Sequence, residues 1–161
     1  MSTMRVSRRN APPAEPGADE QEKLRTVLQR VVVVSEAWAL ANPEPKSLEV
    51  RYYPRPDVEV PDSMPDASEV ESRRAWLRAM AQRLHDTVDV EPPAAPQPVN
   101  CHSGRARSPA VVLAWLRLHH GLRAEHLQWA LGELERRNTE AGHTQKLDGA
   151  LERFGYVLRN L

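Results

Sequence analysis

The segment 100–109 constrains the fold of this 161-residue chain more than any other, because it joins the only cysteine to the start of a helix. Ser108 is a preferred N-cap residue and Pro109 a preferred first helical residue, and an apolar run over residues 110–118 follows them. We therefore predict that a helix begins here. The N–H groups of its first turn lack partners within the helix, and its dipole is positive at this end. The preceding turn, residues 101–107, is thus where an anion is bound best.

The side chains of this turn favour phosphate chemistry. Gly104 can adopt a positive φ angle that lets successive N–H groups converge, and Arg107 offers a planar guanidinium for two phosphate oxygens. The same positive field is expected to lower the pKa of Cys101 from the value of about 8.5 of a free thiol. A thiolate beside a bound phosphate is a nucleophile toward phosphorus. These residues predict attack by Cys101, a phosphocysteine intermediate, and hydrolysis of that intermediate by water.

The arrangement Cys-x5-Arg-Ser, which here runs from Cys101 to Ser108, resembles the signature of the cysteine-based protein tyrosine phosphatase superfamily, most closely its small dual-specificity branch. The resemblance covers residues 24–161, because an apolar helix ending near Gly121 and the segment 122–127 match the two helices that follow the signature in that family. One position departs from the family pattern: the residue before the cysteine is usually histidine, and here it is Asn100. We therefore expect a phosphatase-like site with an altered position before the nucleophile.

The resemblance implies a role for each residue of the loop. The nucleophile is Cys101, Arg107 clamps the phosphate, and Ser108 donates a hydrogen bond to the sulfur when the sulfur leaves. Backbone N–H groups and side chains of the loop bind the phosphate oxygens. The expected phosphate-binding residues are His102, Ser103, Gly104, Arg105, Ala106 and Arg107.

A second element of such a site is the general acid, since phosphoryl transfer from an ester needs a proton donor for the leaving oxygen. Three aspartates, Asp57, Asp62 and Asp66, lie upstream in a proline-punctuated segment. Residues 60–65 resemble the general-acid loop of the family, in which a Pro-Asp pair is followed by another proline. This resemblance favours Asp62, with Asp66 as the alternative because it lies closer to the usual distance from the cysteine. In the plainest interpretation all three are solvated loop residues.

The resemblance and the alternating strand and helix patterns predict an α/β fold. We expect a small central mixed sheet of four to five strands flanked by helices on both faces, as in dual-specificity phosphatases. The four consecutive valines at 31–34 favour an interior strand, and residues 48–52 alternate as a half-buried strand does. A single phosphatase-like catalytic domain is expected over residues 20–161, after a disordered N-terminal tail over residues 1–19.

Prolines crowd the approach to the cysteine. In the family an apolar central strand leads directly into the catalytic cysteine, whereas proline is poorly tolerated in central strands. Only Val99 and Asn100 remain as clean strand residues. Either the strand is very short, or the prolines lie in an inserted linker before it. The prolines are Pro92, Pro93, Pro96 and Pro98.

Composition narrows the function classes. The 22 basic and 22 acidic residues balance, so no general electrostatic attraction to nucleic acid or membrane is expected. One cysteine excludes an internal disulfide framework and suits a reducing compartment, and no apolar run approaches the length of a membrane span. We therefore expect a cytoplasmic protein. The pair His119-His120 lacks accompanying ligands at metal spacing, and we predict no metal and no required cofactor.

The function predicted is that of a phosphomonoester hydrolase acting on phosphotyrosine, phosphoserine or phosphothreonine in proteins. His102 and Arg105 place positive charge in the loop, which keeps a phosphoinositide or inositol polyphosphate substrate as an alternative. Asn100 and the proline-rich approach favour a catalytically silent phosphate-binding module instead. Arsenate reduction usually recruits further thiols, which this chain lacks, and the sulfurtransferase loop is normally shorter. The expected partner is a phosphorylated protein or a small phosphorylated molecule, and no oligomeric state follows from the pattern.

Overall fold

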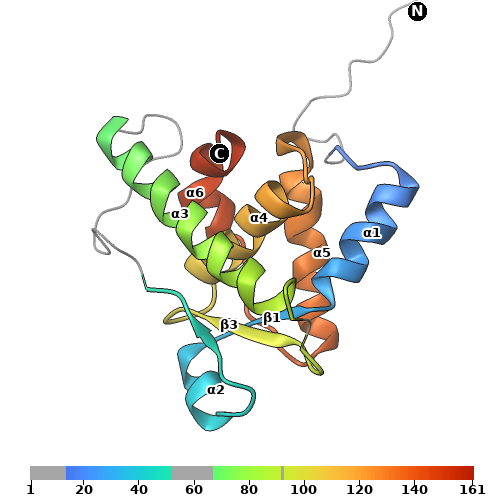
Figure 1. Cartoon of the computed structure of the whole chain (residues 1–161), viewed down its shortest axis with the longest axis vertical. Coiled ribbons are helices and arrows are strands. Elements are labelled where there is room, and N and C mark those ends of the chain that lie inside the picture. The colour runs from blue at the N-terminus through green and yellow to red at the C-terminus, as the bar shows by residue number, and fades with distance from the viewer. Residues whose placement is uncertain (1–13, 52–66, 92) are drawn as a thin grey trace, which may run out of the picture.

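A computed structural model describes residues 14–51, 67–91 and 93–161 of the chain, and these residues are mostly helical (Figure 1). A small sheet lies beneath a layer of helices. The elements follow one another in the order α1 (Ala18–Leu28), β1 (Val31–Val34), α2 (Glu36–Ala41), β2 (Leu48–Glu49), α3 (Ala67–Val88), β3 (Gln97–Asn100), α4 (Arg107–His119), the 3-10 helix η1 (Ala124–His126), α5 (Leu127–Glu140) and α6 (Gly149–Arg159).

The sheet has three strands among the described residues, in the order β1-β3-β2, and all of them are parallel. Val33 pairs with Val99 on one side of β3, and Leu48 pairs with Val99 on the other. The prediction of a mixed sheet of four to five strands is therefore wrong. The stretch before β1 folds as helix α1, which buries Leu24 and Leu28 at helical spacing and supplies no further strand.

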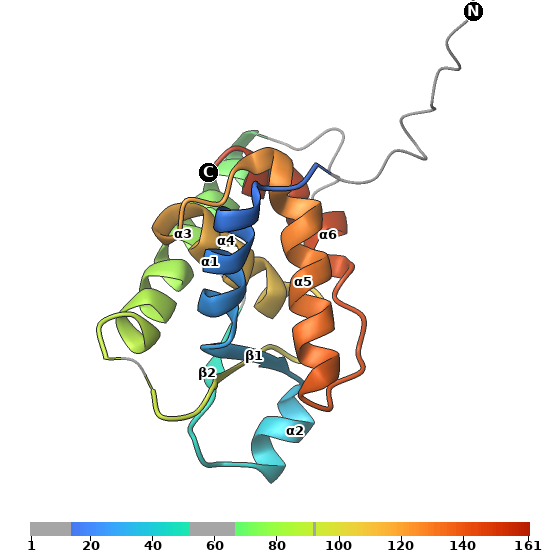
Figure 2. The same cartoon turned by 90° about the vertical axis from the view of Figure 1, so that its right-hand side faces the viewer.

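The helices are distributed unequally between the two faces of the sheet. Helices α1, α3, α4 and α6 lie on one side, and α5 runs alongside and past the β1 edge (Figures 1 and 2). Of the helices that the structure describes, the short α2 alone lies on the other side. The expectation of substantial helical layers on both faces is thus corrected. Helix α4 is the centre of the core, since its residues 108–116 are all buried and Trp115 is fully enclosed. A helix that is apolar all round needs such a position.

Strand β1 lies at the edge of the described sheet, although its four valines predicted an interior strand. All four are buried, because α5 covers the edge. The side chain of Asn138 pairs with Val33 as a neighbouring strand would: Val33 N–H donates to Asn138 Oδ1 at 3.1 Å, and Asn138 Nδ2 donates to Val33 O at 2.7 Å. The edge is therefore closed by an amide side chain.

Strand β3 contains a proline in a central position. The N–H of Gln97 donates to Arg30 O at 2.8 Å on the β1 side, so the nitrogen of Pro98 faces β2. No backbone donor is possible there, and Gln97 Nε2 donates to Lys46 O at 2.8 Å instead. A side-chain amide thus replaces the missing N–H. The strand runs over four residues. It is two residues longer than the pair Val99 and Asn100, which were the residues before the cysteine that the sequence analysis judged suited to a strand.

Helix α1 begins at Ala18, two residues before the expected start of the folded domain, and Pro16 ahead of it is buried. None of the helices in the described part of the chain combines the length and the apolar character that crossing a bilayer requires.

Candidate functional site

The cysteine loop follows the central strand β3 and leads directly into α4, at the lower left of Figure 1. Its residues 101–106 therefore lie at the carboxyl ends of three parallel strands. This is the position at which open parallel sheets bind their ligands. The sequence-based placement of the loop between a strand and a helix is confirmed.

Helix α4 begins two residues earlier than its N-cap signal predicted. Its first residue is Arg107, its N-cap is Ala106, and no side chain caps it. Ser108 is thus a first-turn residue rather than the N-cap. Its Oγ is shielded from solvent and completes no hydrogen bond of good geometry with the described residues. The hydroxyl therefore remains free to turn toward the sulfur of Cys101, which is a weak acceptor as a thiol and a stronger one as a thiolate.

Neighbouring elements hold the loop backbone tightly. Gly104 has a φ of +74°, and a Cβ atom at this position would lie 2.6 Å from the carbonyl oxygen of Val34, so only glycine fits. The N–H of Glu36, the first residue of α2, donates to His102 O at 3.1 Å. At the start of α6, a Cβ on Gly149 would lie 3.0 Å from Ala106 Cβ. Strand β1, α2 and α6 therefore fix the loop from three directions.

The backbone N–H groups of the loop have no oxygen acceptor in the described part of the chain: no oxygen atom there accepts a hydrogen bond from residues 102–107. The N–H groups of Gly104 and Ser108 lower the pKa of the Cys101 thiol. Converging free N–H groups at a helix N-terminus form an anion cradle.

The Cys101 thiol is only 3% exposed. Burial raises its pKa, and the adjacent Ser108 hydroxyl and the N–H groups of Ser108 and Gly104, all of which favour the thiolate, outweigh that effect, with a further contribution from the positive charge of Arg107. The net result is a pKa below that of an ordinary thiol. A larger thiolate fraction at neutral pH follows, which makes the sulfur a better nucleophile.

The cationic and polar side chains of the loop differ in exposure. Arg107 is half-buried and forms no ion pair with a carboxylate of the described residues, so its guanidinium is available to a ligand. His102, Ser103 and Arg105 are exposed and form the rim of the loop. The structure therefore brings together all the predicted loop residues, with Arg107 innermost among the charged ones.

Asn100, which stands where the resembled family has histidine, is buried and hydrogen-bonded. Ser47 Oγ donates to Asn100 Oδ1 at 2.5 Å, and Asn100 Nδ2 reaches the carbonyl oxygen of Cys101 at 3.4 Å. The amide thus links the segment before β2 to the backbone of Cys101. Sequence reasoning missed Ser47, for which no local pattern exists. It also missed the buried Asn138, although this residue follows Leu127, Leu131 and Leu134 on the apolar stripe of α5.

The proposed general acid Asp62 lies outside the described residues, together with its alternatives Asp57 and Asp66. The described part of the candidate site therefore consists of Cys101, the N–H groups of its loop and Arg107. No cluster of three or more His, Cys, Asp and Glu side chains suited to a metal ion occurs within the described ranges.

Comparison with known proteins leaves the chain unassigned: no family model matches it, and neither the curated proteins nor the solved structures contain a match.

Proposed function

We propose that this protein is a phosphomonoester hydrolase that acts through a phosphocysteine intermediate on phosphotyrosine, phosphoserine or phosphothreonine side chains of proteins. One observation carries the proposal: the buried Cys101 opens a loop that ends at the N-terminus of α4, and the N–H groups of residues 102–107 donate to no oxygen atom of the described residues. This arrangement can hold a phosphate dianion directly in front of a nucleophile. An inert buried cysteine has no need of it.

In the proposed reaction, the loop N–H groups and Arg107 bind the three terminal oxygens of the phosphomonoester. The Cys101 thiolate attacks phosphorus, the S–P bond forms, and the ester P–O bond breaks. A carboxylic acid, for which Asp62 is the candidate, gives its proton to the leaving oxygen. Water then attacks phosphorus and gives a proton to the carboxylate formed in the first step, the S–P bond breaks, phosphate is released, and the thiolate and the carboxylic acid are regenerated. The Ser108 hydroxyl stabilises the departing thiolate by a hydrogen bond.

Steady-state hydrolysis of para-nitrophenyl phosphate against pH tests the proposal. We expect Cys101→Ser to lower kcat by about a thousandfold or more, because a hydroxyl at this position stays protonated. The variant should still bind vanadate or phosphate, since the cradle is intact. Asp62→Asn should remove the loss of rate on the basic side of the profile, and Asp66→Asn serves as its matched control. A reversed outcome for the two aspartates would transfer the role to Asp66.

A catalytically silent phosphate-binding module is the second candidate, and Asn100 is the observation that favours it. Its amide is held by Ser47 and cannot titrate, so it supplies no positive charge to the thiolate as a protonated histidine would. In that case the wild type binds phosphate without turnover at any pH. Activity restored by Asn100→His would show that this position alone silences the site.

The exposed His102 and Arg105 also support a polyphosphorylated small molecule as substrate. Both side chains lie on the rim, where further phosphate groups of such a molecule would reach them. The double variant His102→Ala with Arg105→Ala should then reduce kcat/KM for an inositol polyphosphate by more than for para-nitrophenyl phosphate. Equal effects on both substrates would favour a phosphoprotein substrate.

A further inference from the structure

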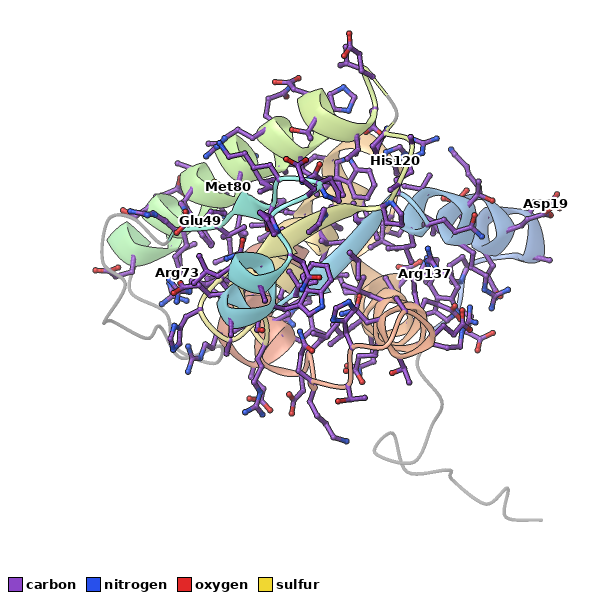
Figure 3. The ribbon with its side chains drawn as sticks, turned by 90° about the horizontal axis from the view of Figure 1, so that it is seen from below. Asp19, Glu49, Arg73, Met80, His120 and Arg137 are labelled. Atoms are coloured by element: carbon purple, nitrogen blue, oxygen red, sulfur yellow. The ribbon has the colours of Figure 1, made fainter. Side chains whose placement is uncertain are left out.

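A separate apolar hollow of about 210 Å³ lies on the face of the sheet that α2 covers. We call it the Trp38 hollow. Val32 of β1, Trp38 of α2 and Pro98 of β3 line it, and Arg137 and His143 from the end of α5 and the segment after it complete it. Figure 3 views the sheet from this side and labels Arg137 beside β1. The hollow is smaller than the roughly 300–1,000 Å³ of sites for drug-sized ligands, so it suits a small molecule.

The charged side chain that lines the Trp38 hollow is positive. Among the described residues that line it none is acidic, and Arg137 is the permanently charged cation there. Within the described residues, Arg137 Nε is shielded from solvent without an acceptor, and the guanidinium makes one long contact, from Nη2 to Gln29 O at 3.4 Å. The adjacent Arg136 differs, because it binds Glu133 at 2.6 Å and Glu140 at 2.7 Å. The Arg137 guanidinium therefore has unused hydrogen-bond donors beside an apolar cavity.

The other titratable group of the hollow does not compete for an anion. Burial lowers the pKa of His143, which keeps its imidazole neutral at neutral pH. The ring lies edge-on against Trp38, with 5.0 Å between ring centroids and an angle of 78° between planes. Trp38 and His143 thus provide a firm aromatic wall next to the guanidinium.

We propose that the Trp38 hollow is a binding site for a small apolar monocarboxylate, such as an aryl-substituted acetate. The apolar part would pack on Val32, Trp38 and Pro98, and the carboxylate would pair with the guanidinium of Arg137. A single planar cation matches a carboxylate, which accepts two parallel hydrogen bonds. Phosphate dianions fit less well, because the apolar walls offer no further donors for their charge. This site is independent of the cysteine loop and of its proposed reaction.

Titration with phenylacetate, followed by calorimetry and tryptophan fluorescence, tests the site on the full chain. Phenylacetamide has the same shape without the charge and is the matched ligand control. We expect phenylacetate to bind at least about tenfold more tightly than the amide, because only the carboxylate forms charge-assisted hydrogen bonds with Arg137. Saturating phosphate should leave its affinity unchanged, since phosphate would occupy the cysteine loop.

Variants locate the site. Arg137→Gln should weaken phenylacetate binding by about tenfold, whereas Arg136→Gln, on the same helix, should leave it unchanged. Trp38→Phe should abolish the fluorescence change while calorimetry still detects binding. Equal affinities for acid and amide, no binding of either, or equal losses in both arginine variants would overturn the proposal. If Arg137→Gln does not fold, NMR shifts induced by phenylacetate in the wild type decide the matter: shifts at Val32, Trp38 and His143 support the site, and shifts centred on the cysteine loop refute it.

Discussion

Opposing influences act on the sulfur of Cys101. Burial disfavours the thiolate, while the Ser108 hydroxyl, two backbone N–H groups and Arg107 favour it and prevail. Ser108 can contribute because Ala106, and not Ser108, occupies the N-cap position of α4. A serine that capped the helix would direct its oxygen toward a backbone N–H of the first turn. A shift of two residues in the helix start therefore changes where this hydroxyl lies.

At the residue scale, we expect Ser108→Ala to raise the pKa of Cys101. The rate of alkylation by iodoacetamide against pH reports the thiolate, and the wild-type midpoint should lie below the value of about 8.5 of a free thiol. The midpoint of Ser108→Ala should move to higher pH, because the thiolate loses a hydrogen-bond donor. Ser103→Ala, at an exposed position of the same loop, is the control and should behave as the wild type. An unchanged midpoint in Ser108→Ala would show that the Ser108 hydroxyl does not lower the pKa of Cys101.

At the scale of elements, side-chain amides supply backbone hydrogen bonds that the strands of the sheet do not provide for one another. Asn138 closes the β1 edge at Val33, and Gln97 supplies the donor that Pro98 lacks. The Asn138 amide accepts from the buried Val33 N–H, which would be costly to leave without a partner. The sheet that carries the cysteine loop therefore depends on a helix and on a side chain of its own central strand.

Replacement of Asn138 by Ala should lower the free energy of unfolding by about 1–3 kcal/mol, because the buried Val33 N–H loses its partner and Val33 O keeps only the longer hydrogen bond from Gln145 Nε2, at 3.4 Å. Denaturation by urea, followed by circular dichroism, measures the change. The neighbouring Thr139→Ala, at an exposed position, should change stability by less than about 1 kcal/mol. A variant of Asn138 as stable as this control would show that the β1 edge needs no closure.

At the scale of the whole molecule, one carboxylate joins segments from three parts of the chain. Asp89 follows α3 and accepts hydrogen bonds from His85 Nδ1 at 2.7 Å, His120 Nε2 at 2.9 Å and Trp115 Nε1 at 2.8 Å. Arg30, between α1 and β1, pairs with its other oxygen at 2.6 Å. The side chain is 8% exposed, so the pairing is not screened by solvent. This network fixes the amino-terminal ends of β1 and β3 relative to the helical layer.

The same network predicts how stability depends on acid. Burial raises the pKa of Asp89, but hydrogen bonds from Trp115, His85 and His120 outweigh it and lower the pKa to about 2. Because the folded pKa lies below the unfolded value of about 3.9, the contribution is present above about pH 4 and is lost as the pH falls toward 2. Its size is about 2 kcal/mol.

Asp89→Asn should therefore lower stability at pH 7 by about 2 kcal/mol and flatten its decline between about pH 4 and pH 2. Urea denaturation at a series of pH values measures both effects. Asp86→Asn, at an exposed position on α3, is the control. Parallel stability curves for the wild type and Asp89→Asn would show that the carboxylate is not the group responsible.

The local features of this chain were predictable from its sequence. Periodic apolar residues indicated the helices, and a glycine, an arginine and a proline around Cys101 indicated a loop between a strand and a helix. These signals depend on near neighbours in the chain, so no knowledge of the fold is needed to interpret them. The phosphate chemistry assigned to the loop comes from the same local pattern and stays a prediction.

The tertiary structure alone decided the number of strands, the edge position of β1 and the partners of Pro98, Asn100 and Val33. Each of these depends on which distant segments meet, since Asn138 lies 105 residues from Val33 and Ser47 lies 53 residues from Asn100. Hydrophobic patterning records that a residue is buried and not what it is buried against. The sequence by itself thus determined the cysteine loop and its helix, whereas packing determined the sheet that presents them.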